Sequence, residues 1–184
     1  MADLRDPAEQ SVAPPIIVAM GISGSGKTTL ARGLAAHLQW PFVEGDDLHP
    51  SANIDRMRRG LPLRDEDRVP WLNAVAGQIA EWRRAASPGV LSCSALKRGY
   101  RNVLRQAAPK NLRFVHLDIS PDEARRRVRG RAGHYMPEAL VESQIAALEK
   151  PAEEQDVLIL DATLPTHETI VRIVSRYIGS ASSP

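Results

Sequence analysis

A glycine-rich segment near the N-terminus has the residue types and spacing of a phosphate-binding loop. Residues 21–28 read G-I-S-G-S-G-K-T, a complete G-x-x-x-x-G-K-[ST] pattern. Its glycines let backbone N–H groups turn toward a polyphosphate, and the N-terminus of a following helix adds a favourable dipole. Lys27 is long enough to reach the β- and γ-phosphates, and the Thr28 hydroxyl is a ligand for Mg²⁺. The predicted contacts to a nucleoside triphosphate are Gly21, Ser23, Gly24, Ser25, Gly26, Lys27, Thr28 and Thr29.

An acidic segment follows the second apolar run of the chain. Residues 44–50 read E-G-D-D-L-H-P. In an open parallel α/β sheet, ligands bind beyond the carboxyl ends of the strands, so these acids would face the phosphate loop. Phosphoryl transfer needs a group that orients and deprotonates the attacking hydroxyl, and charge that holds a metal. The alternative is a helix cap, which fits Asp47 in particular. Asp118 and Asp161 end later apolar runs and are weaker candidates for a metal-side carboxylate.

Two basic segments have the charge to contact phosphates or an anionic acceptor. In residues 92–101, S-C-S-A-L-K-R-G-Y-R, Lys97 and Arg101 are four apart, a spacing that places both on one helix face. Residues 125–137, R-R-R-V-R-G-R-A-G-H-Y-M-P, form a helix end that breaks into a glycine-flanked basic loop. Such a loop can close over the transferring phosphates and supply arginines to their developing charge. A solvated cationic surface and a nucleic-acid patch are the alternatives, and sparse aromatic residues disfavour the second.

Alternating strand and helix signals predict a parallel sheet covered by helices on both faces. Ser120 as N-cap, Pro121 at the first helical position and Glu123 at the N3 position, where it completes a capping box, predict one helix start very clearly. The expected strands are 16–20, 41–44, 90–93, 112–117 and 157–160. The expected helices are 26–39, 50–59, 65–84, 97–106, one that begins after Ser120, 138–149 and 168–178.

The bulk composition suits one soluble domain. The 184 residues are 43% hydrophobic and 25% charged, and no apolar run is long enough to span a bilayer. A flexible tail over residues 1–14 and a single domain over 15–180, with a lid at about 125–140, are expected. The single cysteine, Cys93, suits a reducing cytoplasm, and a net charge of +2 is too small to indicate nucleic-acid binding. We therefore expect a cytoplasmic protein with no membrane or nucleic-acid partner.

Four segments together resemble the gluconokinases. They are the phosphate loop and residues 45–72, 93–105 and 133–151, in order between about residues 16 and 161. The resemblance implies phosphorylation of the 6-hydroxyl of D-gluconate by ATP with Mg²⁺. It also implies a three-layer α/β P-loop kinase fold with a five-stranded parallel sheet and a helical lid, similar to shikimate kinase, and a homodimer.

The resemblance also assigns roles to matching positions. Lys27, Asp46, Arg127 and Arg131 become the catalytic residues, with Asp46 as the base that contacts the acceptor hydroxyl. Thr28 and Glu44 take the metal side, where Glu44 is one methylene longer than the Asp common in relatives. The implied substrate contacts are Asp46, His49, Arg68, Lys97, Arg101 and His134. Adenine contacts are expected only loosely, near residues 161–165.

Three other interpretations stay open at this point. The nearest is another P-loop small-molecule kinase, with shikimate, a nucleoside or another sugar acid as acceptor. A GTP-hydrolysing switch is disfavoured because the chain has no N-K-x-D motif and no D-x-x-G motif after the loop. A nucleic-acid-binding module built on the arginine-rich segment would show salt-sensitive binding.

Overall fold

Five parallel strands form the centre of the molecule in the order β2-β3-β1-β4-β5. The computed structural model describes residues 14–130 and 138–179. The strands are β1 (Ile16–Met20), β2 (Phe42–Glu44), β3 (Gly89–Ser92), β4 (Leu112–Asp118) and β5 (Val157–Asp161). All five residues of the central strand β1 are buried, because both of its faces are covered by helices. The expected five-stranded parallel sheet is confirmed.

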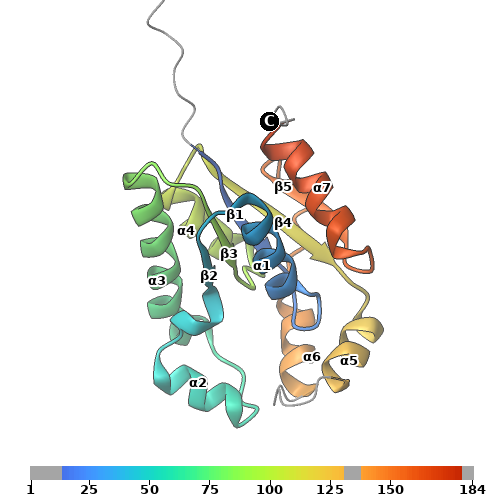
Figure 1. Cartoon of the computed structure of the whole chain (residues 1–184). Coiled ribbons are helices and arrows are strands. Elements are labelled where there is room, and N and C mark those ends of the chain that lie inside the picture. Colours follow the sequence, from blue (N-terminus) through green and yellow to red (C-terminus); the bar gives the residue numbers. More distant parts are fainter. Residues whose placement is uncertain (1–13, 131–137, 180–184) are drawn as a thin grey trace, which may run out of the picture.

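Helices cover both faces of this sheet and give three layers (Figure 1). One face packs on α1 (Lys27–Leu38) and α7 (Thr166–Tyr177), and the other on α3 (Asp65–Arg84) and α4 (Arg98–Ala107). The apolar stripe expected on α3 is buried at Trp71, Val75, Ile79 and Trp82. The fold is therefore the predicted three-layer α/β arrangement.

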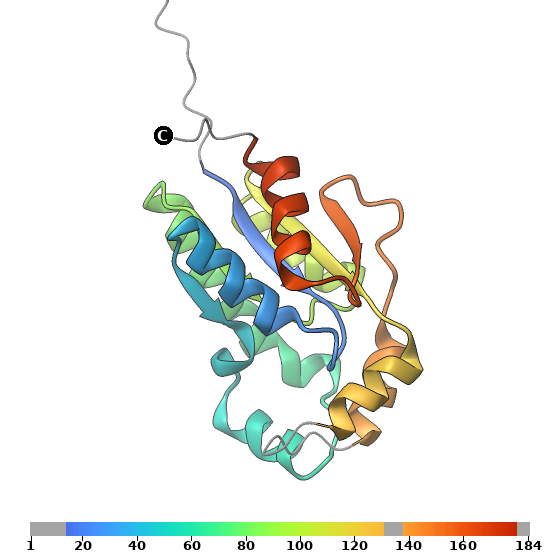
Figure 2. The same ribbon diagram turned by 45° about the vertical axis from the view of Figure 1, so that its right-hand side comes forward.

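Short elements gather beyond the carboxyl ends of the strands. They are the 3-10 helix η1 (Gly45–Leu48), α2 (Ser51–Arg58), α5 (Pro121–Arg129) and α6 (Glu138–Ala147). Figure 2 shows α2 on one side of this end of the molecule and α5 with α6 on the other. Ligands of open parallel sheets bind at this end. Of the expected lid, the structure describes only the flanking helices α5 and α6.

The observed elements differ from the expected ones mainly at their ends. Ser120 caps α5 as expected, because its Oγ accepts from the Glu123 backbone N–H at 3.3 Å. The Glu123 carboxylate does not complete a capping box; it accepts from Arg126 and Arg127. The helix η1 was not expected, since a four-residue 3-10 turn has no apolar period to reveal it. Among the described helices, none combines the length and apolar character needed to cross a bilayer.

Candidate active site

The phosphate loop joins β1 to α1 and has the backbone that its glycines require. Gly24 and Gly26 have φ of 86° and 92°, in the left-handed region that favours glycine. A Cβ on Gly24 would lie 2.7 Å from the backbone oxygen of Ala124 in α5. Because α1 begins at Lys27, the helix dipole favours negative charge in front of this loop.

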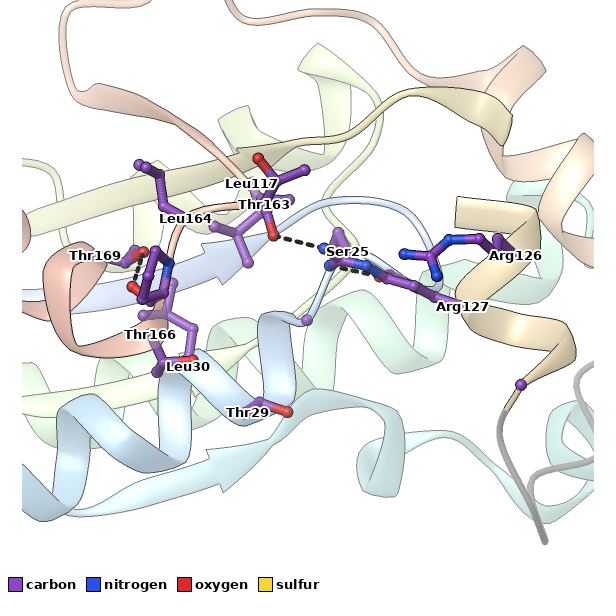
Figure 3. Close-up of a pocket in the computed structure, with 15 residues that line it drawn as sticks. Ser25, Thr29, Leu30, Leu117, Arg126, Arg127, Thr163, Leu164, Thr166 and Thr169 are labelled. Atoms are coloured by element: carbon purple, nitrogen blue, oxygen red, sulfur yellow. Dashed lines mark hydrogen bonds between the residues drawn. The ribbon is translucent and has the colours of Figure 1, made fainter. Parts of the chain in front are cut away.

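A cavity of about 560 Å³ opens beside the phosphate loop, and we call it the nucleotide cavity (Figure 3). It lies between the loop, the start of α1, the end of α5 and the turn after β5. Its lining residues are Gly24, Ser25, Gly26, Thr29, Leu30, Leu117, Arg126, Arg127, Gly130, Ala162, Thr163, Leu164, Pro165, Thr166 and Thr169. Leu30, Leu164, Thr166 and Thr169 lie at the end away from Arg126 and Arg127 (Figure 3), which suits a base at one end and phosphates at the other.

Arg127 connects two walls of the nucleotide cavity. Its guanidinium donates to the backbone oxygen of Ala162 at 3.1 Å and to that of Gly24 at 3.5 Å. Glu123 pairs with it at 2.7 Å and holds it in place. The structure thus brings Arg127 to the phosphate loop. Arg126 lines the same cavity, although no local pattern distinguishes it from its basic neighbours.

A second, smaller cavity of about 50 Å³, which we call the acceptor cavity, has Lys27 in its lining. Its lining residues are Lys27, Asp46, His49, Met57, Pro62, Leu63, Arg68, Trp71, Ser94, Leu96, Tyr100, Leu140, Ser143, Gln144 and Ala147. Lys27 and Asp46 also line the hollow that contains Thr28 and Glu44. These two residues therefore lie where the phosphate side and the acceptor side meet.

Contacts from β3 and α3 fix the position of Asp46. The preceding residue, Gly45, is so close to β3 that a Cβ would lie 2.3 Å from the backbone oxygen of Ser92. The buried Trp71 donates from Nε1 to the Gly45 backbone oxygen at 2.7 Å. Asp46 itself is exposed, so its carboxylate is free to meet a ligand on a firmly held turn.

His49 is placed by the same tryptophan. The two rings stack with centroids 4.6 Å apart and 7° between their planes. Burial lowers the pKa of His49, so the imidazole is neutral near pH 7. Its buried Nδ1 has no hydrogen-bond partner in the described part of the chain. A polar group of a bound acceptor would satisfy it.

Arg68, Lys97 and Tyr100 meet around the carboxylate of Asp65. Lys97 Nζ lies 2.7 Å from Asp65, the Tyr100 hydroxyl donates to it at 2.5 Å, and Arg68 is 3.6 Å away. The hydrogen bond from Lys97 lowers the pKa of Asp65. Arg68 and Tyr100 line the acceptor cavity as well. Lys97 is behind them, 5.7 Å from the Tyr100 ring centroid, and does not line the cavity itself.

Arg101, expected at the substrate side, is placed inside the protein. Its side chain is 1% exposed, and its guanidinium pairs with Glu154. The remaining N–H groups donate to the backbone oxygens of Ala95, Leu96 and Glu149. Lys97 is the N-cap of α4 and has extended backbone, so the four-residue spacing does not place the two cations on one face. Arg101 therefore supports the loop before α4 and does not line the acceptor cavity.

The metal side has oxygen ligands of the kind that Mg²⁺ prefers. Thr28, Glu44, Asp46 and Asp47 line one hollow with the phosphate loop. Ser92 Oγ donates to Glu44 Oε1 and orients that carboxylate. The described residues contain no cluster of three or more His, Cys, Asp or Glu side chains that could hold a metal ion alone. The donors fit an ion held mostly by phosphates and water, the usual arrangement for Mg²⁺. Arg131 and His134 lie outside the described residues.

Comparison with known proteins decides the family. A family model described as "AAA domain" matches residues 16–154. The gluconokinase of Gluconobacter oxydans (strain 621H) is 46% identical over 150 residues, which are 82% of this chain and 84% of that protein. The thermosensitive gluconokinase of Escherichia coli (strain K12) is 45% identical over 145 residues, 78% of this chain and 77% of that protein. This chain belongs to the gluconokinase family.

Solved structures of related kinases have the same fold as this chain. A gluconokinase from Sinorhizobium meliloti 1021 has a TM-score of 0.79 at 40% identity, with 91% of this chain and 98% of that chain covered. A shikimate kinase from Bacteroides thetaiotaomicron shares the fold alone. It has a TM-score of 0.63 at 22% identity, with 88% of this chain and 97% of that chain covered. The protein is therefore an enzyme of the P-loop kinase type.

Proposed function

We propose that this enzyme transfers the γ-phosphoryl group of ATP to the 6-hydroxyl of D-gluconate, giving 6-phospho-D-gluconate and ADP. The observation that carries the proposal is the shared position of Lys27 and Asp46 between the phosphate side and the acceptor cavity. The relatives from Gluconobacter oxydans and Escherichia coli are both gluconokinases, which supports the choice of acceptor.

The transfer is mainly a matter of positioning and charge. Backbone N–H groups of the phosphate loop and Lys27 hold the β- and γ-phosphates. The 6-hydroxyl oxygen attacks the γ-phosphorus in line with the departing β–γ bridging oxygen, and Asp46 takes the hydroxyl proton. Arg127 is close enough to the loop to stabilise the charge that develops on the phosphoryl oxygens. We place Arg131 and His134 in the lid as part of the same proposal.

Thr28 and Glu44 would hold Mg²⁺ on the phosphate side, Glu44 through the metal's water shell. The ion, when bound, neutralises the charge of the phosphate oxygens. Ser92 supports this arrangement, because its hydrogen bond keeps the longer glutamate side chain in one orientation.

The acceptor cavity offers the groups that an anionic polyol needs. Arg68 can bind a carboxylate through paired N–H donors, and Tyr100 and His49 can exchange hydrogen bonds with hydroxyls. Lys97 adds positive charge behind Arg68, although Asp65 offsets part of it. An acceptor of the wrong shape would leave several of these groups unpaired, which is a strong basis for selectivity.

Steady-state ADP release with ATP tests the acceptor directly. The panel consists of D-gluconate, its epimers, shikimate and nucleosides, each at several concentrations. We expect the highest kcat/KM with D-gluconate. Turnover of shikimate or a nucleoside with gluconate untouched would overturn the proposal, and turnover of no acceptor would remove the assigned reaction altogether.

We also propose that the enzyme is a cytoplasmic homodimer that binds neither nucleic acid nor membranes. The arginine-rich helix α5 supports the absence of a nucleic-acid site, because Arg125 pairs with Glu142 while Arg126 and Arg127 pair with Glu123. Light scattering at micromolar concentration tests the dimer. RNA or DNA binding at physiological salt would contradict the proposed absence of a nucleic-acid partner.

A further inference from the structure

The side-chain amide of Gln144 connects α6 to the phosphate loop. The backbone N–H of Ser23 donates to Gln144 Oε1 at 2.7 Å. The same helix packs against the loop through a small apolar cluster that includes Ile22 and the fully buried Val141. Figure 1 places α6 just below the turn between β1 and α1. The hydrogen bond therefore joins two elements that are already held together.

The donor decides which way the amide faces. A backbone N–H can only donate, so the Gln144 atom opposite Ser23 must be the carbonyl oxygen. The two donors on Nε2 are then on the other branch of the amide. In the described residues Nε2 has no protein partner, and Gln144 lines the acceptor cavity with Lys27 and Asp46. A pair of fixed donors is thus available to whatever occupies this cavity.

We propose that Gln144 is a specificity-determining residue that donates from Nε2 to a hydroxyl oxygen of the polyhydroxy-acid acceptor. The inference rests on the proposed function and adds a contact that selects among acceptors. Because Gln144 contacts the phosphate loop, the hydroxyl that it binds lies toward the reacting end of the acceptor. Arg68 is left to bind the carboxylate end.

The selectivity follows from the cost of leaving a donor unpaired. When an acceptor that lacks this hydroxyl, or carries it with inverted configuration, occupies the cavity, an N–H of Gln144 Nε2 is left without a hydrogen-bond partner. A site built to bond a substrate hydroxyl rejects such analogues more strongly than an apolar pocket does. The Ser23 N–H increases this effect, since it prevents the amide from turning over to present its oxygen.

The test compares Gln144→Met and Gln144→Glu with wild type. Methionine keeps the length but has no donor, and glutamate keeps an oxygen for the Ser23 N–H but lacks the Nε2 donors. We expect the KM for the acceptor to rise about 10- to 100-fold in both, the range for an unmade hydrogen bond, with the KM for ATP within about 3-fold in Q144E, which keeps the contact to the Ser23 N–H. Sugar acids deoxygenated at each carbon near the reacting end identify the partner. Removing that hydroxyl weakens wild-type kcat/KM and leaves Q144M unchanged.

Gln78→Met on the surface of α3 is the matched control and should behave as wild type. An unchanged acceptor KM in Q144M and Q144E would overturn the inference. A KM for ATP that rises in parallel in Q144E would also overturn it, because the amide would then serve only the phosphate loop. Failure of the proposed function can be distinguished from failure of the Gln144 inference. If the wild-type enzyme does not phosphorylate gluconate, the proposed function fails, and the variants are then compared with the polyhydroxy acid that the wild-type enzyme does accept. Wild type that accepts none overturns both.

Discussion

Asp46 is the side chain on which the proposed proton transfer depends. It is exposed on η1, while Trp71 and the close approach of Gly45 to β3 hold the backbone beneath it. Asp46→Asn keeps the shape but removes the proton acceptor. We expect kcat to fall by about 10²–10⁴-fold in the ADP-release assay, the usual range for loss of a general base.

The neighbouring Asp47 provides a control substitution for Asp46. Asp47 lies in the same acidic turn and is also exposed, but it does not line the acceptor cavity. Asp47→Asn should therefore lower kcat much less. Near-normal kcat in Asp46→Asn would contradict its role as the base, and an equal loss in both variants would show that the acidic turn acts only through its total charge.

Single residues were predictable where their role follows from a local pattern. The phosphate loop was complete in the sequence because its chemistry depends on contiguous backbone and Lys27. The spacing of Lys97 and Arg101 was misleading, because the helix begins after Lys97 and its inward face buries Arg101. Gln144 gave no separate signal, since its partner is a backbone N–H 121 residues away.

At the scale of elements, α4 is anchored to the loop before β5 by a buried ion pair. The side chain of Glu154 is 7% exposed and pairs with Arg101 and Arg105. Burial raises the pKa of Glu154, but hydrogen bonds from the two arginines outweigh it and lower the pKa to about 2. We expect Glu154→Gln to lower the free energy of unfolding by about 3–5 kcal/mol at pH 7, because Arg101 is left without its counter-charge.

The pH dependence of that loss has a definite sign. A carboxylate with a depressed pKa stabilises the fold above its ordinary value of 4.5 and loses this effect as pH falls toward 2. The difference between wild type and E154Q in urea unfolding should therefore shrink from pH 7 to pH 3. The exposed Glu153→Gln is the control, with a change within about 0.5 kcal/mol. A difference that grows toward acid pH would contradict the ion-pair account.

Element types were predictable from apolar spacing, as α3 shows with its buried stripe from Trp71 to Trp82. The residues at which these elements begin and end were harder to predict, because caps and short 3-10 turns depend on tertiary contacts. The first residue of η1, Gly45, accepts from Trp71 and lies close to the backbone of Ser92, and both contacts are tertiary. No apolar period in the sequence marks such a turn.

At the scale of the whole molecule, the nucleotide joins elements that are far apart in the chain. The nucleotide cavity includes α1, the end of α5 and the turn after β5. At 100 times its Kd, Mg²⁺–ATP should stabilise the fold by about 2.7 kcal/mol, or about 5–10 °C in Tm for a chain of this size. Lys27→Ala should remove most of this shift at the same concentrations. A shift equal to that of wild type would contradict the placement of the triphosphate.

The parallel sheet and its two helical layers were predictable because strands alternate with helices throughout the chain. The strand order β2-β3-β1-β4-β5 could not be predicted in the same way, since residues far apart in sequence make each pairing. The meeting of two cavities at Lys27 and Asp46 depends on that order. It could be expected only in outline, from the rule that ligands bind at the carboxyl ends of parallel strands.

Identification of the product is the decisive experiment for phosphorylation of gluconate at C6. Wild-type enzyme is incubated with Mg²⁺–ATP and uniformly ¹³C-labelled D-gluconate, and the product is analysed by ³¹P and ¹³C NMR. We expect one new phosphomonoester, with ¹³C–³¹P coupling at C6 and its neighbour C5, formed in equal amount to ADP. A phosphate on any other carbon, or ADP formed with the gluconate spectrum unchanged, would contradict it.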